Sequence, residues 1–247
     1  MTDQMARLAG KRVLVTGGTT GIGRATVHQL VAAGARVLTF GRHRDTLDTA
    51  LADAPAGPGS VIGLIADAAT REGIDAVFAA VDERFGGIDI LVANAALGAD
   101  PLHEMPERDW RYVIDTNLTG YLASAQHAIE RMQASGGGHL LFVSSISVHI
   151  KAVGESVYAA TKGGINAFAE TLRKEIADRN IKVSVIEPGS VGTDMQECST
   201  DEQRDAIARH EMLHADEIAE AILFTLTRSE RADVVTLRIE PRVQKTA

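Results

Sequence analysis

The sequence has little of what marks secreted or membrane-spanning chains. Cys198 is the only cysteine, so no disulfide can form within the chain, and a reducing cytoplasm suits such a protein. No apolar run approaches the roughly 20 residues that a membrane-spanning helix needs. The opening stretch, MTDQMARLAGKR, has neither the apolar core nor the cleavage site of a signal peptide. We therefore expect a cytoplasmic protein that does not enter a membrane.

Positive charge and metal-binding patterns are also scarce. The formal net charge is -8, whereas a surface that binds nucleic acid neutralises phosphates with many Lys and Arg side chains. The charge balance therefore argues against a nucleic-acid partner. His210 and His214, in HEMLH, are the one pair among the eight histidines with H-x-x-x-H spacing, and we expect no metal site.

What the chain does contain is a regular alternation of short apolar runs and longer helical segments. Expected strands cover 12–16, 35–40, 60–66, 88–94, 139–145, 181–187 and 233–239. Expected helices include 21–33, 70–85, 107–133, 156–179 and 214–228. Most of the strand segments are almost continuously apolar, which is typical of parallel strands covered on both faces. The alternation predicts an α/β fold with a doubly wound parallel sheet, and no linker divides residues 1–247 into separate domains.

A glycine-rich turn, TGGTTGIG, follows the first expected strand at residues 16–23. Gly17, Gly21 and Gly23 lie where a doubly wound fold needs a tight turn, a close approach to pyrophosphate and close packing of helix on strand. The N-terminus of the following helix presents free N–H groups to phosphate. The spacing differs from G-x-G-x-x-G, but the strand–turn–helix context predicts a dinucleotide site.

A tyrosine and a lysine lie four positions apart in SVYAATKGG, so they share one face of an expected helix. An ammonium about 4 Å from the phenol would lower the pKa of Tyr158 by up to about three units, to near 7. General acid–base catalysis works best at such a pKa. Ser145 lies at the carboxyl end of the fifth expected strand, at the edge where open α/β sheets bind ligands.

With these residues in place, the chain resembles the short-chain dehydrogenase/reductase family over essentially its full length. The resemblance is carried by TGGTTGIG, Asp67, VANAA (92–96), DTNLTG around Asn117, Ser145, the Tyr158–Lys162 pair and EPGSVGT (187–193). It implies a single-domain Rossmann-like fold with a seven-stranded parallel sheet of order 3-2-1-4-5-6-7 and helices on both faces. It also implies that hydride passes between a nicotinamide and the carbon of a carbonyl/alcohol pair.

The family pattern implies a catalytic tetrad in this chain. Tyr158 would exchange the hydroxyl proton, and Ser145 would hydrogen-bond the substrate oxygen. Lys162 would hold the nicotinamide ribose and lower the pKa of the tyrosine, and Asn117 would position a water that links the lysine to solvent. The cofactor-binding residues that the resemblance implies are Gly17, Thr19, Thr20, Gly21, Ile22, Gly23, Arg42, Asp67, Ala68, Asn94, Ala95, Ala96, Tyr158, Lys162, Pro188, Gly189, Val191 and Thr193.

Some of these residues have specific expected contacts. Asp67 would accept a hydrogen bond from the adenine amino group, although it could instead cap the helix that begins near Thr70. Thr193 would meet the nicotinamide carboxamide, and residues 192–213 would cover the substrate. Ala96 departs from the family's usual glycine, which predicts a small local shift of the cofactor. The ending VTLRIEPRVQ weakly resembles the branch that contains clavulanate-type and 3-hydroxy-acid dehydrogenases.

The stretch TFGRHRD concentrates positive charge at the end of the second expected strand. NAD-binding relatives place a carboxylate there to hold the ribose hydroxyls. Gly41 occupies that position here, and the planar fork of Arg42 can grip a 2′-phosphate. This favours NADP(H) over NAD. An NAD-dependent alcohol dehydrogenase of the same family and a non-catalytic dinucleotide sensor remain alternatives.

Weaker signals concern packing and assembly. Trp110 and Tyr112 in ERDWRYVIDTN are interpreted as packing residues rather than a stacking platform. Apolar stripes on residues 118–133 and 156–179 exceed what one sheet face needs, and the family resemblance implies a homodimer or homotetramer through these helices.

Overall fold

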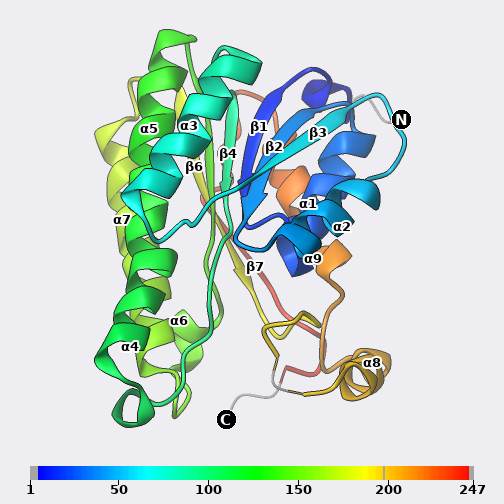
Figure 1. The fold of residues 1–247 in the computed structure, drawn as a ribbon, viewed down its shortest axis with the longest axis vertical. Helices are drawn as coiled ribbons and strands as arrows, with labels where there is room; N and C mark the ends of the chain where they lie inside the picture. Colours follow the sequence, from blue (N-terminus) through cyan, green and yellow to red (C-terminus); the bar gives the residue numbers. More distant parts are fainter. Residues whose placement is uncertain (1–4, 197, 245–247) are drawn as a thin grey trace.

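A parallel sheet of seven strands forms the centre of the computed structural model, which describes residues 5–196 and 198–244. The strand order is β3-β2-β1-β4-β5-β6-β7, as expected (Figure 1). The strands are β1 (Arg12–Thr16), β2 (Arg36–Gly41), β3 (Ser60–Ile65), β4 (Ile90–Ala93), β5 (Gly138–Val143), β6 (Ile181–Pro188) and β7 (Thr236–Ile239). All neighbouring pairs run parallel, so their carboxyl ends meet along one edge.

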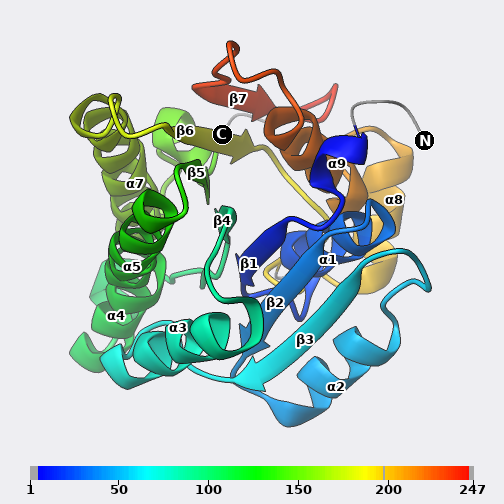
Figure 2. The ribbon, with the colours of Figure 1, turned by 90° about the horizontal axis from the view of Figure 1, so that it is seen from above.

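Helices cover both faces of the sheet (Figure 2). One face carries α1 (Gly21–Ala32), α2 (Arg44–Ala52) and α9 (Ala215–Leu226), and the other carries α3 (Arg71–Phe85), α5 (Gly120–Ala134) and α7 (Ser156–Glu175). Successive strand residues point into different cores: Leu14 of β1 packs with the α3–α5–α7 layer, whereas Val13 and Val15 pack with α1 and α9. This double burial is why the strand sequences are continuously apolar. Among the described residues, no helix combines the length and apolar character needed to cross a bilayer.

The expected helix at 107–133 is wrong in one respect, because it is interrupted. The structure forms α4 (Glu107–Ile114), a π-helical stretch at Asp115–Thr119 and then α5. Such wider turns commonly mark functional sites, and this one contains Asn117. The sequence reading also did not identify α2, the short α6 (Ser147–Ile150) or α8 (Thr200–Ala208).

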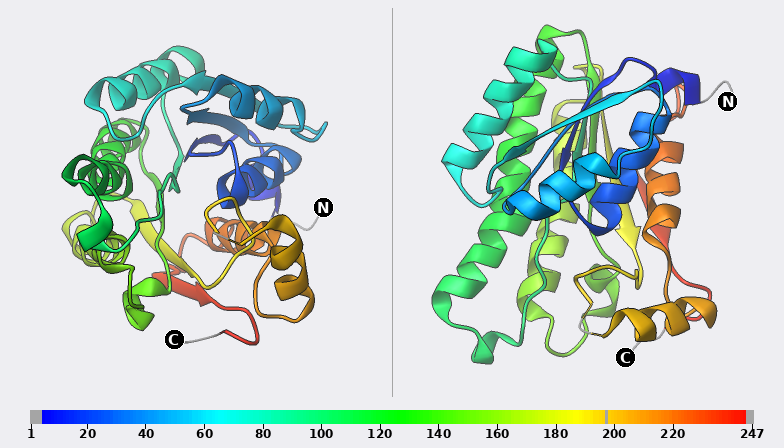
Figure 3. Two further views of the ribbon diagram at one scale, coloured as in Figure 1. Left: turned by 60° about the horizontal axis from the view of Figure 1, so that its bottom comes forward. Right: turned by 45° about the vertical axis from the view of Figure 1, so that its right-hand side comes forward.

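The segment expected to cover the substrate leaves the body of the fold and returns to the same place. Val191 and Leu213 form an isolated parallel bridge, and Gly192 N donates to Leu213 O at 2.9 Å. Between these anchors lies α8, which extends beyond the carboxyl edge of the sheet (Figure 3). Glu197 lies outside the described residues. The substrate-covering role of 192–213 stays a prediction.

An ion pair joins β1 to the turn before β4 at the amino edge of the sheet, opposite the glycine turn. Arg12 donates through Nη2 to Asp89 Oδ1 at 2.7 Å and through Nε to Asp89 Oδ2 at 3.1 Å, and its backbone N–H also donates to Oδ2 at 2.8 Å. Burial raises the pKa of Asp89, but the hydrogen bonds from Arg12 outweigh it and lower the pKa below its usual value. The pair therefore stabilises the fold above the unfolded-state pKa of about 4.

Asp89→Asn should lower the free energy of unfolding by about 1.5–3 kcal/mol at pH 7, because a charge-assisted bidentate contact is lost. Urea denaturation measures the change. The difference from wild type should shrink as the pH falls below about 4, where the unfolded-state carboxyl already holds its proton.

The exposed Arg44–Asp48 pair provides the control, since its side chains are 66% and 60% exposed. Asp48→Asn should change stability by less than about 0.5 kcal/mol. Equal losses from the two variants would contradict a special role for the Arg12–Asp89 pair.

Candidate active site

The glycine turn between β1 and α1 is packed so tightly that side chains would not fit. Gly17 has φ +66°, in the left-handed region, and a Cβ there would lie 2.8 Å from Ala95 Cα. A Cβ on Gly23 would strike the carbonyl oxygen of Gly17 and lie 2.6 Å from Asn94 Nδ2. Gly18, which sequence reasoning missed, is equally constrained, because its Cβ would overlap the side chain of Thr39. The turn therefore carries no side chains at these glycines, so a ligand could approach its backbone closely.

The N-terminus of α1 fits a phosphate group. Thr20 is the N-cap residue, and its side chain makes no capping hydrogen bond. The first N–H groups of a helix have no partner within the helix. These N–H groups point out of the N-terminus of α1, where the positive end of the helix dipole also lies. Both features favour an anion at this position. The residues present therefore fit the pyrophosphate of a dinucleotide.

Asn94 ties the glycine turn to the end of β4. Its backbone N–H donates to Thr16 Oγ1 at 2.8 Å, and its Nδ2 donates to the carbonyl oxygens of Thr16 at 3.1 Å and Gly17 at 3.2 Å. Ala95 N donates to the same Thr16 hydroxyl at 2.9 Å. The side chain amide thus extends the β1–β4 pairing beyond the last strand residues.

The expected nicotinamide wall lies across from the turn. A Cβ on Gly21 would lie 3.1 Å from Thr193 Cγ2, so Thr193 flanks the start of α1. Pro188, the last residue of β6, accepts a hydrogen bond from Ile146 N at 2.9 Å. This bond places the wall next to the segment that follows Ser145. The remaining implied cofactor residues lie along the same edge: Thr19 and Ile22 are half-buried in the turn and α1, Ala68 is buried after β3, Ala96 is half-buried after β4, and Gly189 and Val191 follow β6.

Asn117 is fully buried in the π-helical stretch and holds the chain that leaves β4. Its Oδ1 accepts from Leu97 N and its Nδ2 donates to Leu97 O, both at 2.8 Å. Nδ2 also lies 3.4 Å from Thr161 Oγ1 on α7. Asn117 therefore joins three segments that surround the expected reaction site.

Lys162 is 1% exposed and lies beneath the site. Its Nζ donates to Val143 O at 2.8 Å and to Tyr121 Oη at 3.4 Å. Burial lowers the pKa of the Lys162 ammonium to about 7. Tyr121 was missed by sequence reasoning, although its spacing from Asn117 puts both on one helix face. Burial raises its pKa well above the usual value, so it remains a neutral neighbour of the lysine.

The expected lowering of the Tyr158 pKa by Lys162 is wrong in this structure. Burial raises the pKa of Tyr158 to about 12; a hydrogen bond with Ser145 lowers it, and the carboxylate of Glu155 raises it further. Lys162 Nζ lies 5.7 Å from the centre of the Tyr158 ring. The physical reason is desolvation. Exclusion of water favours the neutral phenol of Tyr158 and also the neutral amine of Lys162, so less positive charge is present to lower the tyrosine pKa.

Ser145 belongs to a short hydrogen-bonded chain that sequence reasoning did not find. Its hydroxyl donates to Ser147 Oγ at 3.2 Å and accepts from Ser147 N at 3.1 Å. Ser147 Oγ in turn donates to Glu155 Oε2 at 2.7 Å. Because a carboxylate can only accept, Glu155 orients both hydroxyl groups. Its position three residues before Tyr158 was the available signal, but nothing local showed where its side chain would point.

The adenosine end of the expected site contains a second linked group of side chains. Arg42 Nη1 donates to Tyr112 Oη at 2.8 Å, and Tyr112 Oη donates to Asp67 Oδ2 at 2.6 Å. The interpretation of Tyr112 as a packing residue is therefore wrong. Helix α3 is capped by Thr70, whose hydroxyl accepts from Gly73 N, so Asp67 is not the cap residue.

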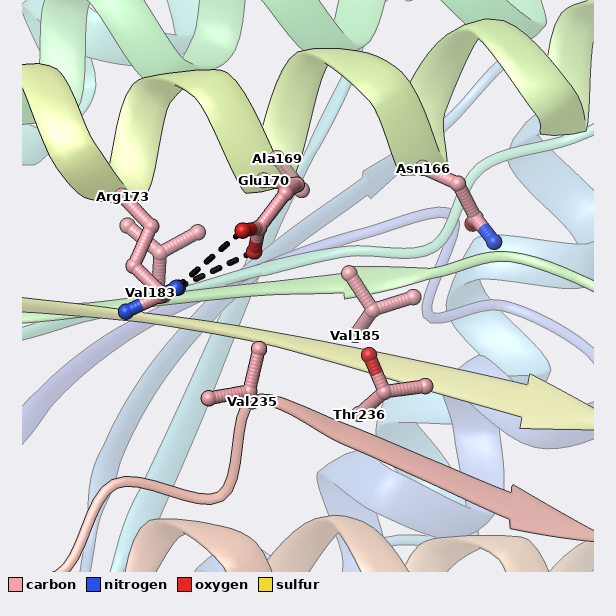
Figure 4. Close-up of a pocket in the computed structure, with 8 residues that line it drawn as sticks. All are labelled: Asn166, Ala169, Glu170, Arg173, Val183, Val185, Val235 and Thr236. Carbon is pink, nitrogen blue, oxygen red and sulfur yellow. Dashed lines mark hydrogen bonds and ion pairs between the residues drawn. The ribbon is translucent and has the colours of Figure 1, made fainter.

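A cavity of about 300 Å³ lies elsewhere, between α7, β6 and β7 (Figure 4). The cavity is lined by Asn166, Ala169, Glu170, Arg173, Val183, Val185, Val235 and Thr236. The Glu170–Arg173 ion pair lies across its lining, at the far end from Asn166. None of the residues implied in catalysis or cofactor binding lines it.

Comparison with known proteins identifies the family of the chain. A family model described as short chain dehydrogenase matches residues 11–204. The chain is 34% identical to a 3-oxoacyl-acyl-carrier-protein reductase of Thermotoga maritima, over 88% of this chain and 91% of that protein. It is 32% identical to an uncharacterized oxidoreductase of Staphylococcus epidermidis, over 96% of this chain and all of that protein.

Solved structures show the same architecture. L-sorbose reductase from Gluconobacter frateurii, complexed with NADPH and L-sorbose, superimposes with a TM-score of 0.86 at 26% identity, covering 97% of this chain and 98% of that one. An alcohol dehydrogenase from Thermococcus sibiricus, complexed with 5-hydroxy-NADP, gives 0.83 at 25% identity, covering 95% and 98%.

Lys162→Met should remove a pH dependence from stability. The folded-state pKa of Lys162, about 7, lies below the unfolded-state value of about 10.4, so between these values the unfolded chain binds more protons. The free energy of unfolding of wild type should therefore rise with pH relative to the variant, by about 2–3 kcal/mol from pH 7.5 to 9.5. Urea denaturation across this range measures it. Parallel curves for the two proteins would contradict an uncharged, buried lysine.

Proposed function

Because the chain belongs to the short-chain dehydrogenase family, we propose that it is an NADP(H)-dependent oxidoreductase that interconverts a ketone or aldehyde and an alcohol. The observation that carries the proposal is the meeting of Ser145, Tyr158 and Lys162 at the carboxyl edge of the sheet. Ser145 lies close enough to Tyr158 to lower its pKa, and Lys162 Nζ lies 5.7 Å from the centre of the tyrosine ring. The glycine turn and the start of α1 lie along the same edge.

The catalytic roles follow from proton placement. A nicotinamide cofactor bound along this edge would supply or accept the hydride. Tyr158 would give its proton to the developing alkoxide, and Ser145 would hold the substrate oxygen beside it. A pKa of about 12 keeps the phenol protonated at neutral pH, which is the form that carbonyl reduction requires. This supports reduction as the direction that the protein favours near neutral pH.

The preference for NADP(H) rests on the end of β2. Gly41 offers no carboxylate to repel a 2′-phosphate, and a Cβ there would lie 2.6 Å from Thr19 Cγ2, so a larger side chain would also crowd the turn. Arg42 is exposed at the same end. Two similar solved structures are complexed with NADPH and 5-hydroxy-NADP, which supports the same choice.

The proposal extends to location, substrate cover and assembly. We place the protein in the cytoplasm, consistent with its single cysteine. Residues 192–213 would cover a small carbonyl or alcohol substrate. Two copies would pair through α5 and α7, which lie side by side on one flank of the molecule and expose Leu122 by 37% (Figure 1).

Tyr158→Phe should reduce kcat for carbonyl reduction by about 10²- to 10⁴-fold, because the general acid is lost. The loss of absorbance of reduced nicotinamide with a panel of carbonyl compounds measures it. The Kd for the cofactor should stay within about threefold of wild type, since the ring remains. Unchanged turnover would contradict the mechanism, and wild type without turnover on any carbonyl or alcohol would favour a dinucleotide sensor.

Arg42→Asp should weaken NADPH binding by about 10- to 100-fold, because a charge-assisted phosphate contact is replaced by repulsion. NADH binding should be unchanged or tighter, since the new carboxylate can hold ribose hydroxyls. Fluorescence titration with both cofactors measures the two dissociation constants. Arg44→Asp serves as the control for a nearby charge change. Equal losses with both cofactors would contradict the proposed preference.

A further inference from the structure

Three side chains from separate parts of the chain meet at the adenosine end of the site. Arg42 follows β2, Asp67 follows β3 and Tyr112 lies on α4. The phenol oxygen of Tyr112 lies 2.8 Å from Arg42 Nη1 and 2.6 Å from Asp67 Oδ2, and the guanidinium carbon of Arg42 lies 5.6 Å from the centre of the tyrosine ring. Their sequence separations of 70 and 45 positions mean that only the folded sheet brings them together.

The direction of each hydrogen bond is determined by the groups themselves. A carboxylate only accepts and a guanidinium only donates, so the single phenol proton goes to Asp67 and the phenol lone pair faces Arg42. Burial raises the pKa of Tyr112, and the hydrogen bond to Asp67 raises it further, so the phenol keeps this proton at neutral pH. The three side chains therefore form a hydrogen-bonded chain in which Arg42 donates to Tyr112 and Tyr112 donates to Asp67.

Both charged ends keep capacity for a ligand. Arg42 has five N–H donors, and its bond to Tyr112 leaves others for a bidentate phosphate contact. Asp67 accepts from Ala69 N through Oδ1 at 2.9 Å and from Tyr112 through Oδ2, and each carboxylate oxygen has a second lone pair for an adenine amino group. The tyrosine can thus stay in place when the cofactor binds.

We propose that Tyr112 is a positioning residue for NADP(H), whose hydroxyl holds Arg42 in the orientation that grips the 2′-phosphate. This inference rests on the proposed use of NADP(H). Arg42 is exposed and long, whereas Tyr112 is anchored on α4 and half-buried. Asp67 is already oriented by Ala69 N, so the phenol matters more to the arginine than to the carboxylate.

The expected loss of NADPH affinity follows from the cost of ordering the Arg42 side chain. Immobilising a free, rotamer-rich side chain on binding weakens a complex by about two- to tenfold. Loss of the phenol hydroxyl leaves Arg42 to be ordered by the cofactor itself. This penalty applies to NADPH, whose 2′-phosphate uses Arg42, and does not apply to NADH.

Tyr112→Phe tests this in the full-length protein, because it removes the hydroxyl and keeps the ring. Fluorescence titrations should give an NADPH Kd about three- to tenfold higher than wild type, with the NADH Kd changed less than twofold. The same substitution made in Arg42→Ala should add no further loss for NADPH, since there is no longer an arginine to hold. Arg44→Ala is the control for the loss of a neighbouring positive charge and should leave both constants near wild type. Circular dichroism and Tm verify that each variant is folded.

The outcomes separate this inference from the proposed function. If wild type binds NADH as tightly as NADPH and Arg42→Ala weakens both equally, the NADP(H) preference fails. If that preference holds but Tyr112→Phe leaves the NADPH Kd unchanged, the positioning role is overturned. An equal loss for both cofactors, or a further loss in Arg42→Ala, would also overturn it, because the tyrosine would then act on the adenine directly.

Discussion

The junction of β1 and β4 is the constraint on which the rest of the site depends. In a doubly wound sheet, the connection that leaves β1 and the connection that reaches β4 lie on opposite faces. A crevice therefore opens between the carboxyl ends of these two strands. Asn94 bonds Thr16 and Gly17 across this gap, while the bare backbone of Gly17 packs against Ala95. The same close contact leaves the N-terminus of α1 facing the carboxyl edge. A side chain at Gly17 would clash with Ala95, and one at Gly23 would clash with the Gly17 carbonyl oxygen and the Asn94 amide, so either would disrupt this junction.

Burial controls the electrostatics beside this junction. Lys162 has lost nearly all contact with water, and its Nζ donates to the Val143 carbonyl and the Tyr121 hydroxyl. The low-dielectric surroundings oppose charge on the lysine and on the Tyr158 phenol alike. The pair therefore rests as a weakly charged amine and a protonated phenol. That arrangement suits proton donation, and the Ser145–Ser147–Glu155 chain orients the neighbouring hydroxyl groups.

One long helical segment connects the two ends of the site. Tyr112 on α4 contacts the groups expected to read the adenosine end, and Asn117 in the π-helical stretch holds Leu97 near the proposed reaction centre. Tyr121, at the start of α5, lies against Lys162. The wider turn at Asp115–Thr119 lies between α4 and α5 and contains the buried Asn117.

The sequence by itself determined the strand order through its resemblance, the glycine turn, and the positions of Gly41, Arg42 and the tyrosine–lysine pair. The strand order came from the family resemblance, and each of the other features follows from local pattern: apolar runs, missing Cβ atoms or helical spacing. The tertiary structure alone decided that Tyr112 bridges Arg42 and Asp67, that Glu155 reaches the serines, and that the Tyr158 pKa rises. These outcomes depend on which distant side chains meet and on how much water is excluded between them, and a linear pattern records neither quantity.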